Sequence, residues 1–445
     1  MANSSRGEFT SSFGFVMAAA GSAVGLGNIW GFPTQTAGNG GAAFVLVYII
    51  LAFLVGYPVL MAEFTIGRYT RMAPPDAYEK LGGGKGYFWI GILGLVTVGF
   101  ILSFYAIIAG GMMAYFVEPL GRFLGLDAFS DWVISQSATS NLVFTSIFFV
   151  LTMLIVSGGV NKGIEKWSKR FMPMLFVLFA VLVIYVLTLD GAMEGIKVYL
   201  LPDFDKIFDP KLITSAMGQA FFSLSLGVGG MLVYGSYTSK DANLTKLGWL
   251  VTICDIGVAF IAGLLIIPAM YAAANLGTEI FDASGALISG PNLIFQVLPG
   301  LFESMGPIGW LVALIFFLLM SIAALTSSIA MLEPVVAYVV DSGKAERKKA
   351  TWFTGGFFWL VSIIVVFNYD KLFNLLVTAT TVYGQPFLGL AIAIFAGWVI
   401  RKNILLNELK NGFPEIEKSF FYKIWPIFLK VVCPILILLV FLQSF

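Results

Sequence analysis

The chain has 445 residues, of which 59% are hydrophobic and 11% are charged, and its formal net charge is +1. This composition excludes an ordinary soluble domain and is typical of a protein that crosses a membrane several times. The near-neutral charge gives no indication of a nucleic-acid partner, and the sequence has no histidine, which excludes imidazole catalysis and imidazole metal sites. Its two cysteines both fall in apolar segments, so we expect neither a disulfide framework nor a cysteine metal site.

Eleven apolar runs are long enough to cross a bilayer as helices. In chain order they lie at about 11–36, 42–67, 88–117, 141–157, 167–189, 212–236, 244–273, 307–339, 350–367, 373–399 and 424–443. No long linker interrupts the series, so we expect one transmembrane domain over residues 1–445. The longest connections are at about 190–211 and 274–306, and the second is a candidate for a short helical hairpin.

The distribution of lysine and arginine predicts how these helices are oriented. Placing the N-terminus in the cytoplasm puts twenty of these residues on the cytoplasmic side and five on the other, with Lys430 near the start of the last helix. Cytoplasmic loops of membrane proteins carry an excess of lysine and arginine. We therefore expect a cytoplasmic N-terminus, and eleven helices then place the C-terminus outside.

The first apolar segment is interrupted by Gly21, Gly25, Gly27, Gly31 and Pro33. Glycine and proline lower helix propensity, and an interrupted helix is tolerated inside a membrane only where its free backbone groups face protein or a cavity. Free carbonyls can bind a cation, and the N-terminus of a half-helix can bind an anion. The stretch therefore predicts a site for a cation and an anionic solute, the alternative being a glycine-rich packing seam between helices.

A second interruption lies in the sixth segment. Residues 219–230 (QAFFSLSLGVGG) again place polar residues and glycines in the middle of an apolar run. Paired interruptions at corresponding places in two halves of a chain indicate a transporter site built from an inverted repeat. The repeats would cover about 11–189 and 212–399, with an extra helix at about 424–443.

Several motifs, in this order and spacing, resemble the neurotransmitter:sodium symporter family, and most closely its bacterial amino-acid transporters of the LeuT type. They are GSAVGLGNIWGFP, AGNGGAAF, EFTIGR, KGIEKWSKRFMP, GQAFFSLSLGVGG and ALTSSIAMLEP. The resemblance implies an all-α membrane fold with a five-plus-five inverted repeat, in which helices one and six are unwound at mid-membrane. It also implies sodium-driven uptake of an amino acid by alternating access in a bacterial inner (plasma) membrane.

Two sodium sites are implied by this resemblance, and oxygen ligands suit such a hard cation. Site 2 would use the carbonyls of Gly21, Val24 and Ala323 with the hydroxyls of Thr326 and Ser327. The alternative for these hydroxyls is a hydrogen bond to the preceding turn of their own helix.

Site 1 would use the Ala23 carbonyl with the side chains of Asn28, Ser223 and Asp255. Asp255 is the only acid in its apolar segment, where a carboxylate is costly unless it is paired or functional. Chloride-dependent members of the family carry asparagine in this position, so Asp255 is expected to replace the charge of chloride, and no chloride is predicted. Asp255 is also a candidate proton site, which would give H⁺ counter-transport, whereas pairing with a neighbouring hydroxyl would be purely structural.

The resemblance also implies a substrate site. The N–H groups of Leu26 and Gly27, with the Tyr105 hydroxyl, would bind a carboxylate. The amine would be bound by the carbonyls of Ala23, Phe222 and Ser223 and by the Ser225 side chain, and the side-chain pocket would comprise Ile101, Tyr105, Phe222, Val228, Ser327 and Met331. Because family members that carry decarboxylated monoamines have aspartate where this chain has Gly25, we expect a substrate with its own carboxylate. The pocket favours a large hydrophobic or aromatic side chain, although plain helix packing also explains such residues.

The gates match the family only in part. Arg6 and Asp341 correspond to the inner-gate ion pair, with Phe9 and Tyr237 nearby. The outer-gate arginine is replaced by Gly31, and its acidic partner is absent from the Phe373–Asn374 region, so outer closure would depend on Phe222 over Tyr105. In the fifth segment Gly163 and Pro173 mark a point where local unwinding would open a water path, or where the helix is simply kinked.

We therefore predict a Na⁺-coupled, Cl⁻-independent symporter for a hydrophobic amino acid, and not an enzyme. The alternatives are a carrier of a related hydrophobic carboxylate that lacks the amine, and a ligand-gated channel or sensor on the same scaffold. The partners expected are the amino-acid substrate and the lipid bilayer. The sequence leaves the substrate's identity, the sodium stoichiometry and the oligomeric state open.

Overall fold

A computed structural model describes residues 7–281, 287–288 and 293–443 of the chain. These residues form an all-helical structure, with no element of sheet beyond one antiparallel bridge between Phe281 and Leu287. The all-α part of the predicted fold class is thereby confirmed.

Nine helices or continuous helix runs within the described residues are long and apolar enough to cross a membrane. They are Ala42–Thr70 (α3, η2 and α4), Phe88–Phe123 (α6), Ala138–Ser157 (α8), Val160–Val186 (η3 and α9), Leu244–Asn275 (α13), Gly309–Asp341 (α15), Arg347–Phe367 (α16), Tyr369–Val399 (α17, η7, α18 and η8) and Phe420–Gln443 (α20, η10 and α21). They correspond to nine of the eleven segments predicted from the sequence.

The two remaining segments are the ones predicted to be interrupted, and both are. In the first, α1 (Ser12–Ala23) is followed by η1 (Gly27–Gly31) and α2 (Phe32–Gly38), with a bend of 52° at the break. In the sixth, α11 (Pro210–Ser223) and α12 (Gly230–Ser236) are separated by six non-helical residues. Left-handed backbone at Gly227 (φ 87°) and Gly229 (φ 81°) explains this second break, because glycine adopts positive φ without a steric penalty.

The connections contain short helices. They are α5 (Pro74–Gly82), α7 (Asp127–Ile134), α10 (Ala192–Leu200), η4 (Phe204–Lys206), η5 (Leu293–Val297), α14 (Leu298–Ser304), η6 (Gly306–Ile308), α19 (Lys402–Lys410) and η9 (Pro414–Lys418). The hairpin expected at about 274–306 falls partly outside the described residues, and its described part contains η5 and α14.

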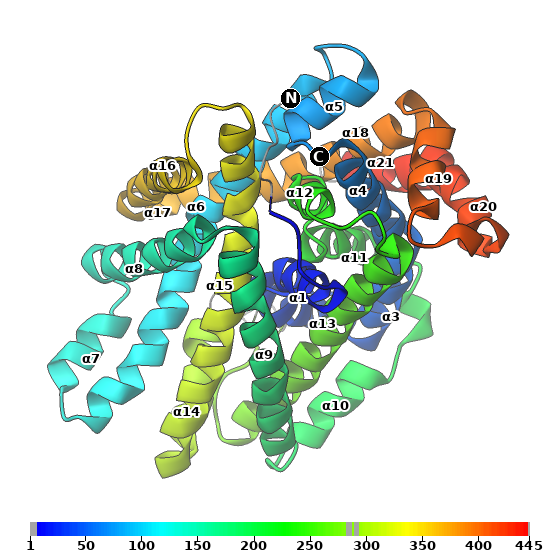
Figure 1. Cartoon of the computed structure of the whole chain (residues 1–445). Coiled ribbons are helices and arrows are strands. Elements are labelled where there is room, and N and C mark those ends of the chain that lie inside the picture. Colours follow the sequence, from blue (N-terminus) through cyan, green and yellow to red (C-terminus); the bar gives the residue numbers. More distant parts are fainter. Residues whose placement is uncertain (1–6, 282–286, 289–292, 444–445) are drawn as a thin grey trace.

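The interrupted helices lie at the centre of the bundle. Figure 1 shows α1 surrounded by α9, α12, α13 and α15, with α11 beside them, and the contacts agree for α9, α12, α13 and α15. The backbones of α4 and α12 approach especially closely, since a Cβ atom added at Gly67 would lie 1.9 Å from the Leu232 carbonyl oxygen. Such glycine-mediated contact is typical of helix packing in membranes.

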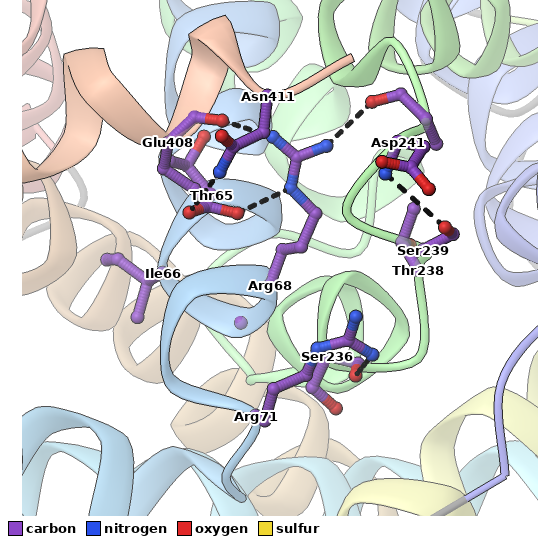
Figure 2. A network of polar contacts seen from close by, with 12 residues as sticks. Thr65, Ile66, Arg68, Arg71, Ser236, Thr238, Ser239, Asp241, Glu408 and Asn411 are labelled. Carbon is purple, nitrogen blue, oxygen red and sulfur yellow. Dashed lines mark hydrogen bonds and ion pairs between the residues drawn. The ribbon is translucent and has the colours of Figure 1, made fainter.

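One end of α4 is joined to α19 by a buried charge pair (Figure 2). The Arg68 guanidinium is wholly buried, and its Nε lies 2.8 Å from Glu408 Oε1. Arg68 also donates to the carbonyl of Ala242 at 2.7 Å and to that of Glu408, while Asn411 donates to the second oxygen of the Glu408 carboxylate at 3.0 Å. The paired charges thus connect α4 to α19 and to the loop at Ala242, both distant in the sequence.

Candidate functional site

A central cavity of about 30 Å³ lies between the two helix breaks. It is lined by Ser22, Ala23, Gly25, Leu26, Gly27, Val98, Ile101, Tyr105, Phe222, Ser225, Val228, Gly230, Ser327, Ala330, Met331 and Gln385. Ten of the eleven residues predicted to bind substrate are among them. The exception is Ser223, which instead contacts the Asp255 carboxylate. In this conformation the cavity has room for one or two waters, but not for an amino acid.

The polar end of this cavity lies at the first helix break. The Leu26 N–H donates to the Tyr105 hydroxyl at 3.3 Å. A Cβ atom at Gly25 would lie 2.3 Å from Ser327 Oγ and 2.9 Å from Tyr105 Oη. Any side chain in place of Gly25 would therefore occupy the space between these two hydroxyls. The Tyr105 hydroxyl and the Leu26 N–H together can bind one small anionic group.

The groups predicted to bind an amine are partly engaged with each other. The Ser225 hydroxyl donates to the Ser22 carbonyl at 3.1 Å, and the Ser225 N–H donates to the Phe222 carbonyl at 3.1 Å. Ser225 has positive φ (52°), which places its N–H and hydroxyl within the break rather than along a helix. The carbonyl groups retain a second lone pair each for a ligand.

Asp255 lies at the centre of a buried cluster of donors. Asn28 Nδ2 and Ser223 Oγ each donate to Asp255 Oδ1 at 2.7 Å, and Tyr48 Oη donates to Oδ2 at 3.2 Å. Asn28 also accepts a hydrogen bond from the Gly25 N–H at 3.3 Å. All of these side chains are buried. Three of the four ligands predicted for sodium site 1 therefore lie together, and the fourth, Ala23, lines the adjoining cavity.

Tyr48 was not singled out by the sequence analysis. It is a single polar residue within the apolar run of α3, and nothing in the sequence around it indicates a partner in the sixth or seventh segment. Its hydroxyl also lies 3.3 Å from Ser223 Oγ, so it extends the Asp255 cluster to a fourth helix segment, α3.

The residues predicted for sodium site 2 also lie together. Ser327 Oγ is 3.3 Å from each of the carbonyl oxygens of Gly21, Ser22 and Val24. One hydroxyl has a single proton and can donate to only one of these carbonyls at a time. Thr326 Oγ1 lies 2.9 Å from the Ala323 carbonyl, which is also the back-bond expected in the alternative interpretation. A set of oxygens at these separations, richer in acceptors than in donors, fits a hard cation.

A second, larger cavity of about 590 Å³ adjoins the central one and is called the vestibule here. Leu26, Tyr105 and Phe222 line both cavities and so form the wall between them. Gly31, Phe373 and Asn374, the positions where the family's ion pair is absent, all line the vestibule. In its place the Phe373 ring packs edge-on against Phe104, with 5.8 Å between ring centroids.

At the N-terminal end of α1, Phe9 packs against Tyr237, with 6.3 Å between ring centroids, and donates its N–H to the Tyr237 carbonyl. Asp341 accepts a hydrogen bond from the Ala73 N–H at 3.0 Å. Arg6, its predicted ion-pair partner, lies outside the described residues.

A buried charge pair beside this aromatic contact escaped the sequence analysis. Glu333 is wholly buried, pairs with Arg347, and accepts a hydrogen bond from the Tyr237 hydroxyl at 2.6 Å. Glu333 belongs to the MLEP end of a motif quoted above, and a single acid near the end of an apolar run was the available signal.

The fifth segment is helical throughout the predicted weak point. Gly163 lies in the π-helical turn η3 (Val160–Glu165), where a Cβ atom would be 2.0 Å from the Ile155 carbonyl oxygen. Pro173 lies inside α9 (Lys166–Val186). The unwinding of this segment stays a prediction.

Two discontinuous helices that meet at one central cavity are typical of secondary transporters. A model of the Sodium:neurotransmitter symporter family matches residues 6–144 and 134–445. The chain belongs to that family, and it is a sodium-dependent, multi-pass membrane transporter rather than an enzyme.

Similar proteins agree with this assignment. A sodium-dependent transporter of Bacillus subtilis, YhdH, is 38% identical over 98% of this chain and 97% of its own length. The bovine sodium- and chloride-dependent taurine transporter is 28% identical over 76% of this chain and 61% of its own length. Among solved structures, MhsT in complex with L-phenylalanine superposes with a TM-score of 0.86, at 37% identity, covering 99% of this chain and all of that one.

Proposed function

We propose that this transporter couples Na⁺ to the import of a large hydrophobic or aromatic amino acid, independently of chloride. The observation that carries the proposal is the central cavity, whose largely apolar walls carry polar groups at the helix breaks and on Tyr105, Ser327 and Gln385. At one break the Leu26 N–H and the Tyr105 hydroxyl lie 3.3 Å apart, where a substrate carboxylate would accept from both.

Gly25 supports a substrate that carries its own carboxylate. A side chain at this position would collide with Ser327 and Tyr105, as the Cβ distances of 2.3 and 2.9 Å indicate. Glycine at this position therefore lets the two hydroxyls approach the helix break, where the Tyr105 hydroxyl would donate to a carboxylate of the substrate.

Sodium would be held on either side of the first helix break. Site 2 would comprise the carbonyls that surround the Ser327 hydroxyl, together with Thr326 and Ala323. Site 1 would comprise Asn28, Ser223 and Asp255, with the Ala23 carbonyl. These ligands would be carbonyl, hydroxyl, carboxylate and amide oxygens, which suit a hard cation.

Chloride independence is proposed from the charge of Asp255. Its carboxylate already accepts hydrogen bonds from three different helix segments, so a fixed negative charge stands where these donors converge. When sodium leaves site 1, a proton would neutralise the same buried carboxylate at lower cost than leaving it charged. We accordingly propose H⁺ counter-transport through Asp255.

The orientation proposed for the transporter in the membrane rests on the distribution of lysine and arginine, and an inward Na⁺ gradient would then drive import. With the N-terminus in the cytoplasm of a plasma membrane, the vestibule opens to the outside and Phe9 and Tyr237 lie toward the inside. Phe222 would close the outer side, because it lines the wall between vestibule and cavity. Substrate entry requires this wall to move, since the cavity of about 30 Å³ is too small for an amino acid.

An aromatic substrate is supported by the similar structure of MhsT, which was solved with L-phenylalanine. In this chain the cavity walls include Val228 and Met331. A flexible methionine adapts to irregular apolar ligands.

The test is binding of a panel of amino acids and their keto acids to the purified protein, in Na⁺ against K⁺ and in chloride against gluconate. We expect Na⁺-dependent binding of a large apolar amino acid that is indifferent to chloride. Preference for the keto acid would refute the amine contacts at Ser225 and Phe222. Chloride dependence would refute the role of Asp255. Conductance far above transporter turnover, or binding without flux, would instead identify a channel or a sensor.

A further inference from the structure

Gln385 is one of several polar residues in the largely apolar wall of the central cavity. It is the first residue of α18 (Gln385–Ile394), and the residue is buried, with a relative exposure of 3%. Its Nε2 donates to the Leu226 carbonyl at 3.4 Å. Its Oε1 is buried and accepts no hydrogen bond from any residue that the structure describes.

The Leu226 carbonyl determines which end of the amide is unpaired. Leu226 belongs to the six-residue break between α11 and α12, so its carbonyl oxygen has no helical partner of its own. Turning the amide over would bring two acceptor oxygens face to face, because Oε1 would then point at this carbonyl. The unpaired atom is therefore an acceptor, and a buried acceptor without a donor is destabilising.

The backbone around Gln385 is in contact with the same break. A Cβ atom at Gly227 would lie 3.0 Å from the Gln385 carbonyl oxygen and 3.1 Å from the Gly389 nitrogen. The start of α18 and the break in the sixth segment thus lie against one another without intervening side chains. Any ligand that binds the Gln385 side chain acts on both elements.

We propose that Gln385 is a specificity-determining residue, whose Oε1 accepts a hydrogen bond from a donor on the substrate's aromatic ring. This inference rests on the proposed function. The carboxylate of the substrate would bind at Leu26 and Tyr105, and its ring would lie against Val98 and Ile101, since all of these line one cavity with Gln385. The substrate class is then an amino acid with an indole N–H or a phenol O–H, in preference to phenylalanine or leucine.

The discrimination follows from the unpaired acceptor. A ring with a donor satisfies Oε1, whereas a ring of the same shape without a donor leaves it buried and unpaired. We expect the donor to improve affinity roughly three- to tenfold, the range of one net neutral hydrogen bond.

The test compares ligands of matched shape on the purified full-length transporter. The probes are tryptophan against 3-benzothienylalanine, in which sulfur replaces the indole N–H, and tyrosine against phenylalanine. We expect each donor-bearing ligand to bind roughly three- to tenfold more tightly in Na⁺. Gln385→Leu removes the acceptor, and in this variant the ratio for each pair should fall to one or below, because the donor of the ligand is then buried without a partner. A ratio near one in the native protein, or an unchanged ratio in the variant, would overturn the proposal.

The native protein alone suffices if Gln385→Leu fails to fold, because the ligand pairs need no variant. Failure of this inference is also distinguishable from failure of the proposed function. If large apolar amino acids bind in a Na⁺-dependent way without preference for a donor, the role of Gln385 is refuted and the proposed function stands. If no amino acid binds in a Na⁺-dependent way, the proposed function itself is refuted.

Discussion

The Asp255→Asn substitution is the sharpest test of how charge is balanced at sodium site 1. An asparagine amide has nearly the shape of the carboxylate. Its oxygen can replace Oδ1 and accept from Asn28 and Ser223, both of which donate at 2.7 Å. Its NH₂ group can then donate to the Tyr48 hydroxyl, which lies 3.2 Å from Oδ2. The geometry can therefore survive, and the main change is the loss of one negative charge.

The size of the effect follows from that charge. Two unit charges 4 Å apart interact by about 4 kcal/mol at an effective dielectric constant of 20. Because the amide oxygen still serves as a ligand, we expect a loss of about 2–4 kcal/mol in Na⁺ binding, or roughly 30- to 1,000-fold in affinity. Chloride bound near Asn28 and Tyr48 would restore part of the lost Na⁺ affinity.

The assay is Na⁺ titration of substrate binding in chloride and in gluconate, for the native protein and for Asp255→Asn. We expect the variant, and not the native protein, to bind more tightly in chloride. Glu63→Gln is the matched control, because it also removes the charge of a fully buried acid. Glu63 accepts from the Gly227 N–H at 2.8 Å, in the break of the sixth segment, and so lies outside the Asp255 cluster. Native Na⁺ affinity in Asp255→Asn, with no effect of chloride, would refute the reasoning.

Three further substitutions test the site and the fold. Ser327→Ala removes the hydroxyl shared by three carbonyls, and should lower Na⁺ affinity at least about tenfold in the same titration; an unchanged Na⁺ dependence would contradict site 2. Gly25→Ala should cost about 1–3 kcal/mol through overpacking against Ser327 and Tyr105, and weaken substrate binding in a calorimetric titration; native affinity would mean that this space is not used. Arg68→Ala leaves Glu408 buried and unpaired, so thermal unfolding should show a loss of about 3–5 kcal/mol, with Arg68→Lys intermediate; equal stability of both variants and the native protein would contradict the network in Figure 2.

The helix breaks were predictable because glycine and proline report backbone conformation directly. The exact residues at which each helix breaks were less predictable. α1 ends at Ala23, and Val24 is extended (φ −75°, ψ 98°), although valine itself has no special tendency to end a membrane helix. The chain then returns to helix at Gly27 as a π-turn, despite its glycines. Packing against neighbouring segments decided these details, and no local propensity carries that information.

The sequence analysis did not identify the uncharged polar residues that stand alone within apolar runs. Tyr48 and Gln385 belong to no motif. Each has a hydrogen-bond partner more than a hundred residues away in the sequence, which is Asp255 for Tyr48 and Leu226 for Gln385. Asp255 was found because a lone carboxylate in an apolar segment demands an explanation. A hydroxyl or an amide in the same position is a weaker signal of function, since either can form a hydrogen bond to its own helix.

The first helix break links the proposed ion sites to the proposed substrate site through consecutive residues. The Val24 carbonyl accepts from Ser327, the Leu26 N–H donates to Tyr105 at the central cavity, and the Asn28 side chain donates to the Asp255 carboxylate. An ion on either side would therefore fix the backbone of the same short stretch. Ordering that stretch beforehand removes an entropic cost from substrate binding, because the N–H is already oriented when the carboxylate arrives. Coupling of sodium to substrate then requires no contact between them, and it is reciprocal, so substrate must raise the affinity for Na⁺ by the same factor.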